Sequence, residues 1–213
     1  MRPCRRRQAV TAILLGLVTF LAAGTALAVR PFTEIVVEGG AALPLGDLHD
    51  DYFTPKGFGA GTGYAVGFRF REQWLSGWAV SPSFHYVKFD KFVGTRADPA
   101  TDFESKTSLY RYGFDVEYHF PARRGRPRWF VTFGAALIRN RLREDYIQDD
   151  SYFEDGVNSV AAAAGVGVRT GDFEIAVRYT LDRFETLRFW PGVDSYNWDH
   201  VLVTVGFALP RAY

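Results

Sequence analysis

Two short segments of the chain carry residue types that could perform acid–base or nucleophilic chemistry. Ser83 and His85 stand two positions apart, and Asp115 and Glu117 stand two positions apart further along the chain. In an extended segment, residues two positions apart lie on the same face. A serine, a histidine and a carboxylate on facing surfaces could act as nucleophile, base and orienting partner. Such spacing is common, so the role of these residues depends on the structural elements that position them.

The segment 107–120 contains the second pair, and it alternates strictly between two kinds of side chain. Its even positions from 110 onward are large and apolar or aromatic, whereas its odd positions include charged residues and a glycine. This period of two predicts a strand with one apolar face and one polar face. Such a strand is also long enough to cross a bilayer when tilted, which takes about 9–11 residues. The apolar face comprises Tyr110, Tyr112, Phe114, Val116, Tyr118 and Phe120.

Strand-like segments recur along the chain, and the connections between them alternate between long and short. Antiparallel strands place alternate connections at opposite ends, so all long loops lie at one end and all tight turns at the other. The eight expected strands are Thr33–Leu43, Gly59–Arg71, Trp74–Lys88, Ser108–Phe120, Arg128–Asn140, Ser159–Arg169, Asp172–Asp182 and Trp198–Leu209. The long connections are Pro44–Phe58, Phe89–Thr107, Arg141–Asn158 and Arg183–Asn197, and the short ones are Glu72–Gln73, Pro121–Pro127 and Thr170–Gly171.

Alternation alone fits either a membrane barrel or a soluble periplasmic lipocalin-like barrel, which differ in the face that points outward. The polar faces here are rich in glycine, alanine and serine and poor in lysine, which suits the narrow interior of eight strands. Aromatic residues that flank the short turns are expected to form an interfacial girdle. We therefore predict an all-β, eight-stranded antiparallel up-and-down transmembrane β-barrel. The girdle residues are Trp74, Tyr118, Phe120, Trp129 and Phe173.

The N-terminal residues predict export. Three consecutive arginines, Arg5 to Arg7, precede an apolar run that ends in Ala26-Leu27-Ala28, as in a cleaved signal peptide. The expected organisation is a signal over residues 1–28 and a barrel domain over residues 29–213. Cleavage removes four of the 25 basic residues, so 21 remain against 24 acidic ones and the formal charge is −3. That balance gives no indication of a nucleic-acid partner.

In layout and alternation, the chain resembles the small OmpA/OmpX-type outer-membrane β-barrels, the opacity-porin class. The resemblance implies the outer membrane of a Gram-negative bacterium, contact with outer-membrane lipid and lipopolysaccharide, and insertion by the barrel-assembly machinery. That machinery reads a final alternating strand, and here Pro210 departs from the pattern because proline has no N–H for the ladder. No cofactor is expected. The alternating positions are Val203, Val205, Phe207 and Leu209.

If the apolar faces meet lipid, a set of charged residues must point into the lumen. Both signs occur in similar number, which predicts a salt-bridged plug that satisfies buried charge. A small-conductance, porin-like ion path remains the alternative. The expected lumenal residues are Glu34, Glu38, Arg69, His85, Arg111, Asp115, Glu117, His119, Glu174, Arg178 and Asp182.

The long connections are the expected location of any specific function, such as contact with an extracellular protein partner. The connection 141–158 is rich in acidic residues and could be a solvated loop, a divalent-cation site or a partner surface, while the connection 183–197 is expected to expose aromatic residues. We expect no enzymatic activity and no metal site. Outer-membrane lipid A deacylases use a His-x-Ser order, which Ser83-x-His85 reverses. The aromatic residues are Phe184, Phe189, Trp190 and Tyr196.

Overall fold

The computed structural model describes residues 32–210, apart from residues 54, 55, 98, 99, 124, 149 and 185–194. The predicted signal peptide, residues 1–28, lies outside the described residues, as do residues 29–31 and 211–213 of the predicted barrel domain. Among the described residues, no helix has the length and apolar character needed to cross a membrane.

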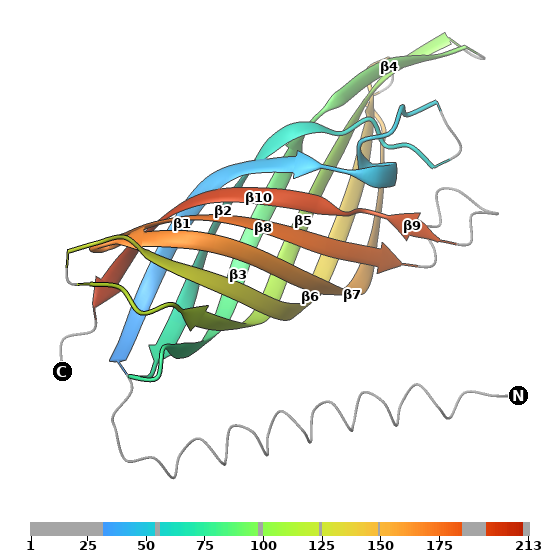
Figure 1. The fold of residues 1–213 in the computed structure, drawn as a ribbon. Coiled ribbons are helices and arrows are strands. Elements are labelled where there is room, and N and C mark those ends of the chain that lie inside the picture. Colours follow the sequence, from blue (N-terminus) through green and yellow to red (C-terminus); the bar gives the residue numbers. More distant parts are fainter. Residues whose placement is uncertain are drawn as a thin grey trace, which may run out of the picture. The chain divides into compact units, whose positions relative to one another are not determined.

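The described chain forms an antiparallel sheet that closes on itself (Figure 1). Eight strands pair in the order β1-β2-β3-β5-β6-β7-β8-β10, and β10 then pairs with β1. Two short strands lie outside this ring, since β4 pairs only with β5 and β9 with β8. The predicted up-and-down barrel is confirmed. The strands are β1 Phe32–Pro44, β2 Gly61–Gln73, β3 Trp78–Asp90, β4 Phe92–Ala97, β5 Ala100–His119, β6 Arg128–Tyr146, β7 Tyr152–Thr170, β8 Phe173–Phe184, β9 Tyr196–Asn197 and β10 His200–Pro210.

Side chains alternate between the two sides of the barrel wall as the sequence predicts. Tyr112 is 57% exposed on the outside, whereas its neighbour Arg111 is fully buried inside. On β8, Val177 is 43% exposed and Glu174 is 2% exposed. Apolar groups therefore face outward and ionic groups inward. A lipocalin-like barrel has the reverse arrangement, so the soluble alternative is wrong.

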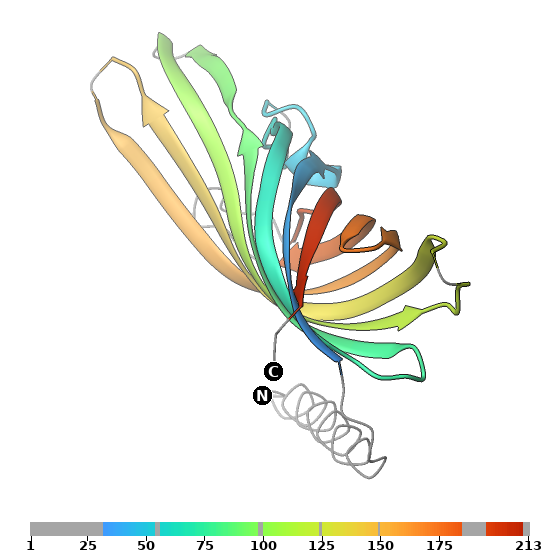
Figure 2. The same ribbon diagram turned by 90° about the vertical axis from the view of Figure 1, so that its left-hand side faces the viewer.

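Two of the predicted loops are mostly strand. The predicted connection Phe89–Thr107 forms the β4–β5 hairpin, and the predicted connection Arg141–Asn158 forms the ends of β6 and β7, which pair as far as Asp145 and Tyr152. These hairpins continue past the rest of the ring at one end (Figures 1 and 2). The same positions of β6 still point inward there, but the chemistry of the two faces changes: apolar Leu142 is buried inside and charged Arg143 is exposed outside. The predicted ends of these strands were wrong. Beyond the apolar wall the outer face is charged, so it no longer shows the alternation expected of a strand that faces lipid.

Tight turns join the strands at the opposite end. Gly77 and Gly171 have φ angles of +92° and +61°, a conformation that glycine adopts without the strain of a Cβ atom. Trp74 lies in the β2–β3 turn rather than at the start of a strand, and its backbone N–H donates to the carbonyl of Trp78 at 2.9 Å. At the long-loop end, the connection between β1 and β2 contains a short 3₁₀ helix, η1 Gly46–Leu48.

Candidate functional site: two layers inside the barrel

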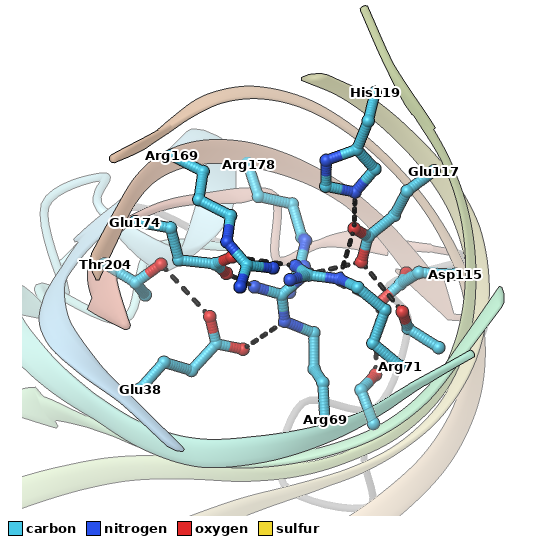
Figure 3. A network of polar contacts seen from close by, with 12 residues as sticks. Glu38, Arg69, Arg71, Asp115, Glu117, His119, Arg169, Glu174, Arg178 and Thr204 are labelled. Carbon is cyan, nitrogen blue, oxygen red and sulfur yellow. Dashed lines mark hydrogen bonds and ion pairs between the residues drawn. The ribbon is translucent and has the colours of Figure 1, made fainter. Parts of the chain in front are cut away.

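Near the tight turns, the barrel interior contains a layer of ion pairs. Five arginines and five carboxylates from five strands meet there, and all but Arg169 are nearly inaccessible to solvent. Figure 3 shows most of this group from close by. Because the signs balance, the layer carries little net charge despite its burial. We call this group the ionic layer, and it consists of Glu34, Glu38, Arg69, Arg71, Arg111, Asp115, Glu117, Arg169, Glu174 and Arg178.

Arg69 lies near the centre of the ionic layer. Its Nη1 donates to Glu117 Oε1 at 2.6 Å, and its Nη2 donates to Glu174. Its Nε lies 3.1 Å from Glu38 Oε1. One guanidinium therefore joins carboxylates from three other strands, and the planar array of Arg donors suits such bridging.

Arg71 extends the layer toward the turns. Its Nη1 donates to Glu34 at 2.6 Å, its Nε to Glu117 at 2.9 Å and its Nη2 to Glu174 at 2.8 Å. Arg169 forms a two-pronged pair with both oxygens of Glu34, at 2.5 and 2.9 Å. Glu34 is thus held by arginines from two different strands, which offsets the cost of burying its charge.

A second group surrounds Asp115. Arg111 Nη2 donates to Asp115 Oδ1 at 2.8 Å, and Arg178 Nη2 lies 3.5 Å from Oδ2. Ser83 links the group, because its hydroxyl accepts from Arg111 Nη1 at 2.8 Å and donates to Asp115 Oδ2 at 3.1 Å. The hydroxyl of Ser83 is therefore engaged with a carboxylate and a guanidinium.

The two predicted lumenal histidines lie at different places in the layer. His85 Nε2 contacts Glu38, which also accepts from the hydroxyl of Thr204 at 3.3 Å. His119 Nε2 lies 3.0 Å from Glu117 Oε2, and its ring stacks on Phe130 with centroids 5.0 Å apart. Each imidazole thus pairs with a carboxylate that also contacts arginine.

Small residues make room for the ionic layer. A Cβ atom at Gly134 would lie 2.0 Å from Asp115 Oδ1 and 2.8 Å from the backbone oxygen of Phe114. A Cβ atom at Gly113 would lie 2.3 Å from Arg111 Nη1. These distances are far below van der Waals contact, so the packing of the layer depends on glycine at both positions.

Ten of the eleven predicted lumenal residues lie in or against the ionic layer, and Asp182 does not. Asp182 instead accepts from Asn140 Nδ2 at 2.9 Å, toward the long-loop end. Sequence reasoning left out Arg71 and Arg169, which stand at the ends of their predicted strands. Both lie within the predicted bounds and share the inward parity of their strands, so the same alternation already predicted an inward position for them.

The structure does not join Ser83 and His85 into a nucleophile–base pair, because they contact Asp115 and Glu38 respectively. Among the described residues, no group of three or more histidine, cysteine or acidic side chains could hold a metal ion.

Toward the long loops, the interior is apolar instead. Inward side chains of the ring pack there against the β1–β2 connection and the segment that precedes β10. We call this group the apolar cap, and its members are Ala42, Leu48, Phe58, Ala60, Ala65, Val87, Phe89, Leu109, Ala136, Ile138, Leu142, Ala161, Phe184, Tyr196, Trp198 and Leu202.

Aromatic rings from distant segments form the centre of the apolar cap. Phe58 and Phe184 each meet the ring of Trp198 nearly edge-on, with centroids 5.0 and 5.2 Å apart. Tyr196 stacks on Phe184 at 5.5 Å. The prediction that Phe184 and Tyr196 are exposed is therefore wrong, because both rings turn inward. Phe189 and Trp190 lie outside the described residues.

The predicted acidic loop also contributes to the interior. Glu144 is fully buried, and it accepts hydrogen bonds from the hydroxyls of Tyr52 and, at 3.1 Å, Tyr146. The expectation of a wholly solvated loop is wrong at this position, because β6 continues and turns Glu144 inward. Asp149 lies outside the described residues.

The predicted girdle residues lie near the tight turns. Phe120, Trp129 and Phe173 are 44%, 58% and 60% exposed, and the Tyr118 ring lies 5.0 Å from that of Trp78. Trp74, in the β2–β3 turn, is only partly exposed. Sequence reasoning missed Trp78, which is 51% exposed at the start of β3.

Neither a family model nor a curated protein matches this chain in sequence. Solved structures do match it in fold. Neisserial surface protein A superposes with a TM-score of 0.54 at 14% identity, covering 84% of this chain and 97% of that protein. Ail, the attachment invasion locus protein of Yersinia pestis, superposes with a TM-score of 0.52 at 13% identity in its complex with the heparin analogue sucrose octasulfate, covering 85% and 100%.

These superpositions extend over nearly the whole described barrel, and they agree with its ring of eight strands. The chain has the fold of the small outer-membrane β-barrels, as its sequence predicted.

Proposed function

We propose that this protein is a non-enzymatic barrel of the bacterial outer membrane with a structural and surface-interaction role. Its lumen is closed by the ionic layer and the apolar cap, and its projecting hairpins form the surface that meets partners outside the cell. The observation that carries the proposal is the pairing of an apolar outer wall with a lumen filled at two levels.

The outer wall supports membrane insertion. Apolar side chains on several strands expose about half of their surface on the ring's outside, although they would be buried in a soluble protein. Charged side chains on the same strands are enclosed. This arrangement is stable where hydrocarbon covers the wall, because lipid removes the cost of exposing apolar groups to water.

The filled interior supports a structural role rather than general diffusion. Eight strands enclose only enough space for side chains, and here arginines and aromatic rings occupy it. The extended hairpins β4–β5 and β6–β7 support the surface-interaction part of the proposal, because they carry paired backbone and charged side chains beyond the apolar wall. Ail, which has the same fold, is named for attachment and invasion.

Cell fractionation with a heat-modifiability gel tests membrane residence. We expect the mature protein in the outer-membrane fraction, where the folded barrel should migrate differently from the boiled chain. Recovery in the aqueous periplasmic fraction, with no difference between unboiled and boiled samples, would overturn the proposal.

A small-conductance channel is the second candidate, and the ionic layer favours it because charged groups line the narrow interior. Planar-bilayer recording separates the two functions. A closed lumen predicts no conductance from the native protein. Reproducible conductance steps that disappear in Arg69→Gln would favour the channel instead.

A further inference from the structure

The outer wall of the barrel holds a basic pocket that the lumen and the hairpin tips do not explain. It has a volume of about 160 Å³ and opens sideways between strands β3, β5, β6 and β7. Four of its lining residues are cations and one is acidic, so its charge is positive. The lining residues are Lys88, Lys106, Thr107, Ser108, Arg141, Arg143 and Glu154.

The strand register explains why these side chains meet. Lys88 pairs with Ser108, and Ser108 pairs with Arg141 on the other side. Lys106 pairs with Arg143. This pair lies two residues along each strand from the pair of Ser108 and Arg141, on the same outer face and further from the apolar wall. Two adjacent rows of cations therefore face outward from neighbouring strands, and Ser108 lies between Lys88 and Arg141 in the first row.

The pocket lies directly above an aromatic row. Two residues before Lys88, the Tyr86 ring packs between those of Tyr64 and Tyr110, with centroids 6.4 and 5.1 Å away. Tyr64 is 49% exposed, and Tyr86 and Tyr110 are half-buried. Outward tyrosines of this kind collect at the membrane–water interface, where the ring meets hydrocarbon and the hydroxyl meets headgroups. The basic pocket then lies at the level of the headgroups, and a ligand reaches it from the side.

The cations of the pocket are only partly neutralised. Arg141 pairs with Glu154 at 2.5 Å, and both Lys106 and Arg143 contact Asp145 at 2.6 Å. Lys106 Nζ also lies 3.1 Å from Glu104 Oε2, so three carboxylates face the four cations. Among the described residues, Lys88 has no carboxylate partner. The guanidinium side chains of Arg141 and Arg143 are 42% and 49% exposed, so these pairs are screened by solvent and exchange easily.

We propose that this pocket binds a phosphate group of a phosphorylated glycolipid in the outer leaflet. Lysine, arginine and hydroxyl donors converge as phosphate recognition requires. The lateral opening at headgroup level favours a lipid over a soluble anion. This inference rests on the proposed membrane residence and adds to it a defined lipid contact.

The test uses the mature full-length barrel, refolded in phosphatidylcholine nanodiscs that contain diphosphoryl lipid A, dephosphorylated lipid A or neither. Retained lipid is counted by native mass spectrometry after release into mild detergent. We expect preferential retention of the diphosphoryl form, and about a tenfold loss of it in the double variant Lys88→Gln/Arg141→Gln, which removes two charge-assisted contacts. Arg126→Gln, in the exposed β5–β6 turn, is the matched control and should retain lipid normally.

Two outcomes would overturn the inference. The double variant could retain diphosphoryl lipid A as well as the native protein, or millimolar inorganic phosphate could displace the lipid fully, which would make the pocket a site for soluble anions. Failure of the native protein to fold in any nanodisc would instead contradict membrane residence, so the two proposals fail in distinguishable ways.

Discussion

The ionic layer and the apolar cap both fill the interior of the barrel, but they do so with opposite chemistry. Near the tight turns, ten charged groups fill the space and satisfy one another, whereas near the long loops aromatic and aliphatic groups fill it without charge. Ion pairs depend on every partner being present, because an isolated buried charge is costly. Apolar packing tolerates small changes of shape. The comparison predicts that equal-sized substitutions will have unequal effects in the two layers.

Arg69→Ala should have the largest effect, because the carboxylates of Glu38, Glu117 and Glu174 would lose a shared cation. We expect the free energy of unfolding to fall by roughly 3–5 kcal/mol. Urea titration of the refolded barrel in lipid vesicles measures it. Arg126→Ala, in an exposed turn, is the control, and equal midpoints for the two variants would show that the ionic layer contributes little.

Nearly isosteric substitutions compare the layers directly. Glu117→Gln keeps shape but removes a charge that Arg69 and Arg71 contact, and we expect a loss of roughly 2–4 kcal/mol. Leu48→Met in the apolar cap keeps volume and should cost less than about 1.5 kcal/mol. The same urea titration compares them, and equal losses would break the distinction between the layers.

Gly134→Ala tests how closely the ionic layer is packed. The added methyl group would lie 2.0 Å from Asp115 Oδ1, so the carboxylate must move away from Arg111. We expect a loss of about 1–3 kcal/mol, as for other overpacked cores. Ala135→Val, on the outward face next to it, should change the unfolding midpoint little. A harmless Gly134→Ala would mean that the layer can rearrange.

The smallest effect is expected outside the wall, at Asp145. Its hydrogen bond with Lys106, followed by that with Arg143, lowers the pKa of the Asp145 carboxyl. A lowered pKa contributes stability above the unfolded value, about 3.9, and that stability is lost as pH falls through the folded value. The native protein should lose stability below about pH 4, and the Lys106→Met variant should lose less. The difference should be at most about 1 kcal/mol, because the pair is exposed. Unfolding curves from pH 7 to pH 3 for both proteins check this, and a larger difference would show stronger coupling.

The sequence was sufficient to predict the ring and most of the ionic layer, apart from Arg71 and Arg169, but not the apolar cap. Strict alternation placed Arg111 and Glu174 inside because the outer face was apolar and only one parity could meet lipid. Beyond the apolar wall this rule no longer holds, so the paired ends of β4–β7 were predicted to be loops. The apolar cap depends on contacts such as that of Phe58 with Trp198, which no local period encodes.

The apolar cap includes residues from both ends of the barrel sequence, and this has a consequence for assembly. The backbone N–H of Leu45 donates to the carbonyl of Asp199 at 2.8 Å, and that of Asn197 donates to Asp47 at 2.8 Å. These contacts flank the β1–β10 seam, where the first and last strands of the ring pair. Trp198 becomes enclosed only when that seam forms, so the wavelength of its emission should report the moment at which the first and last strands join.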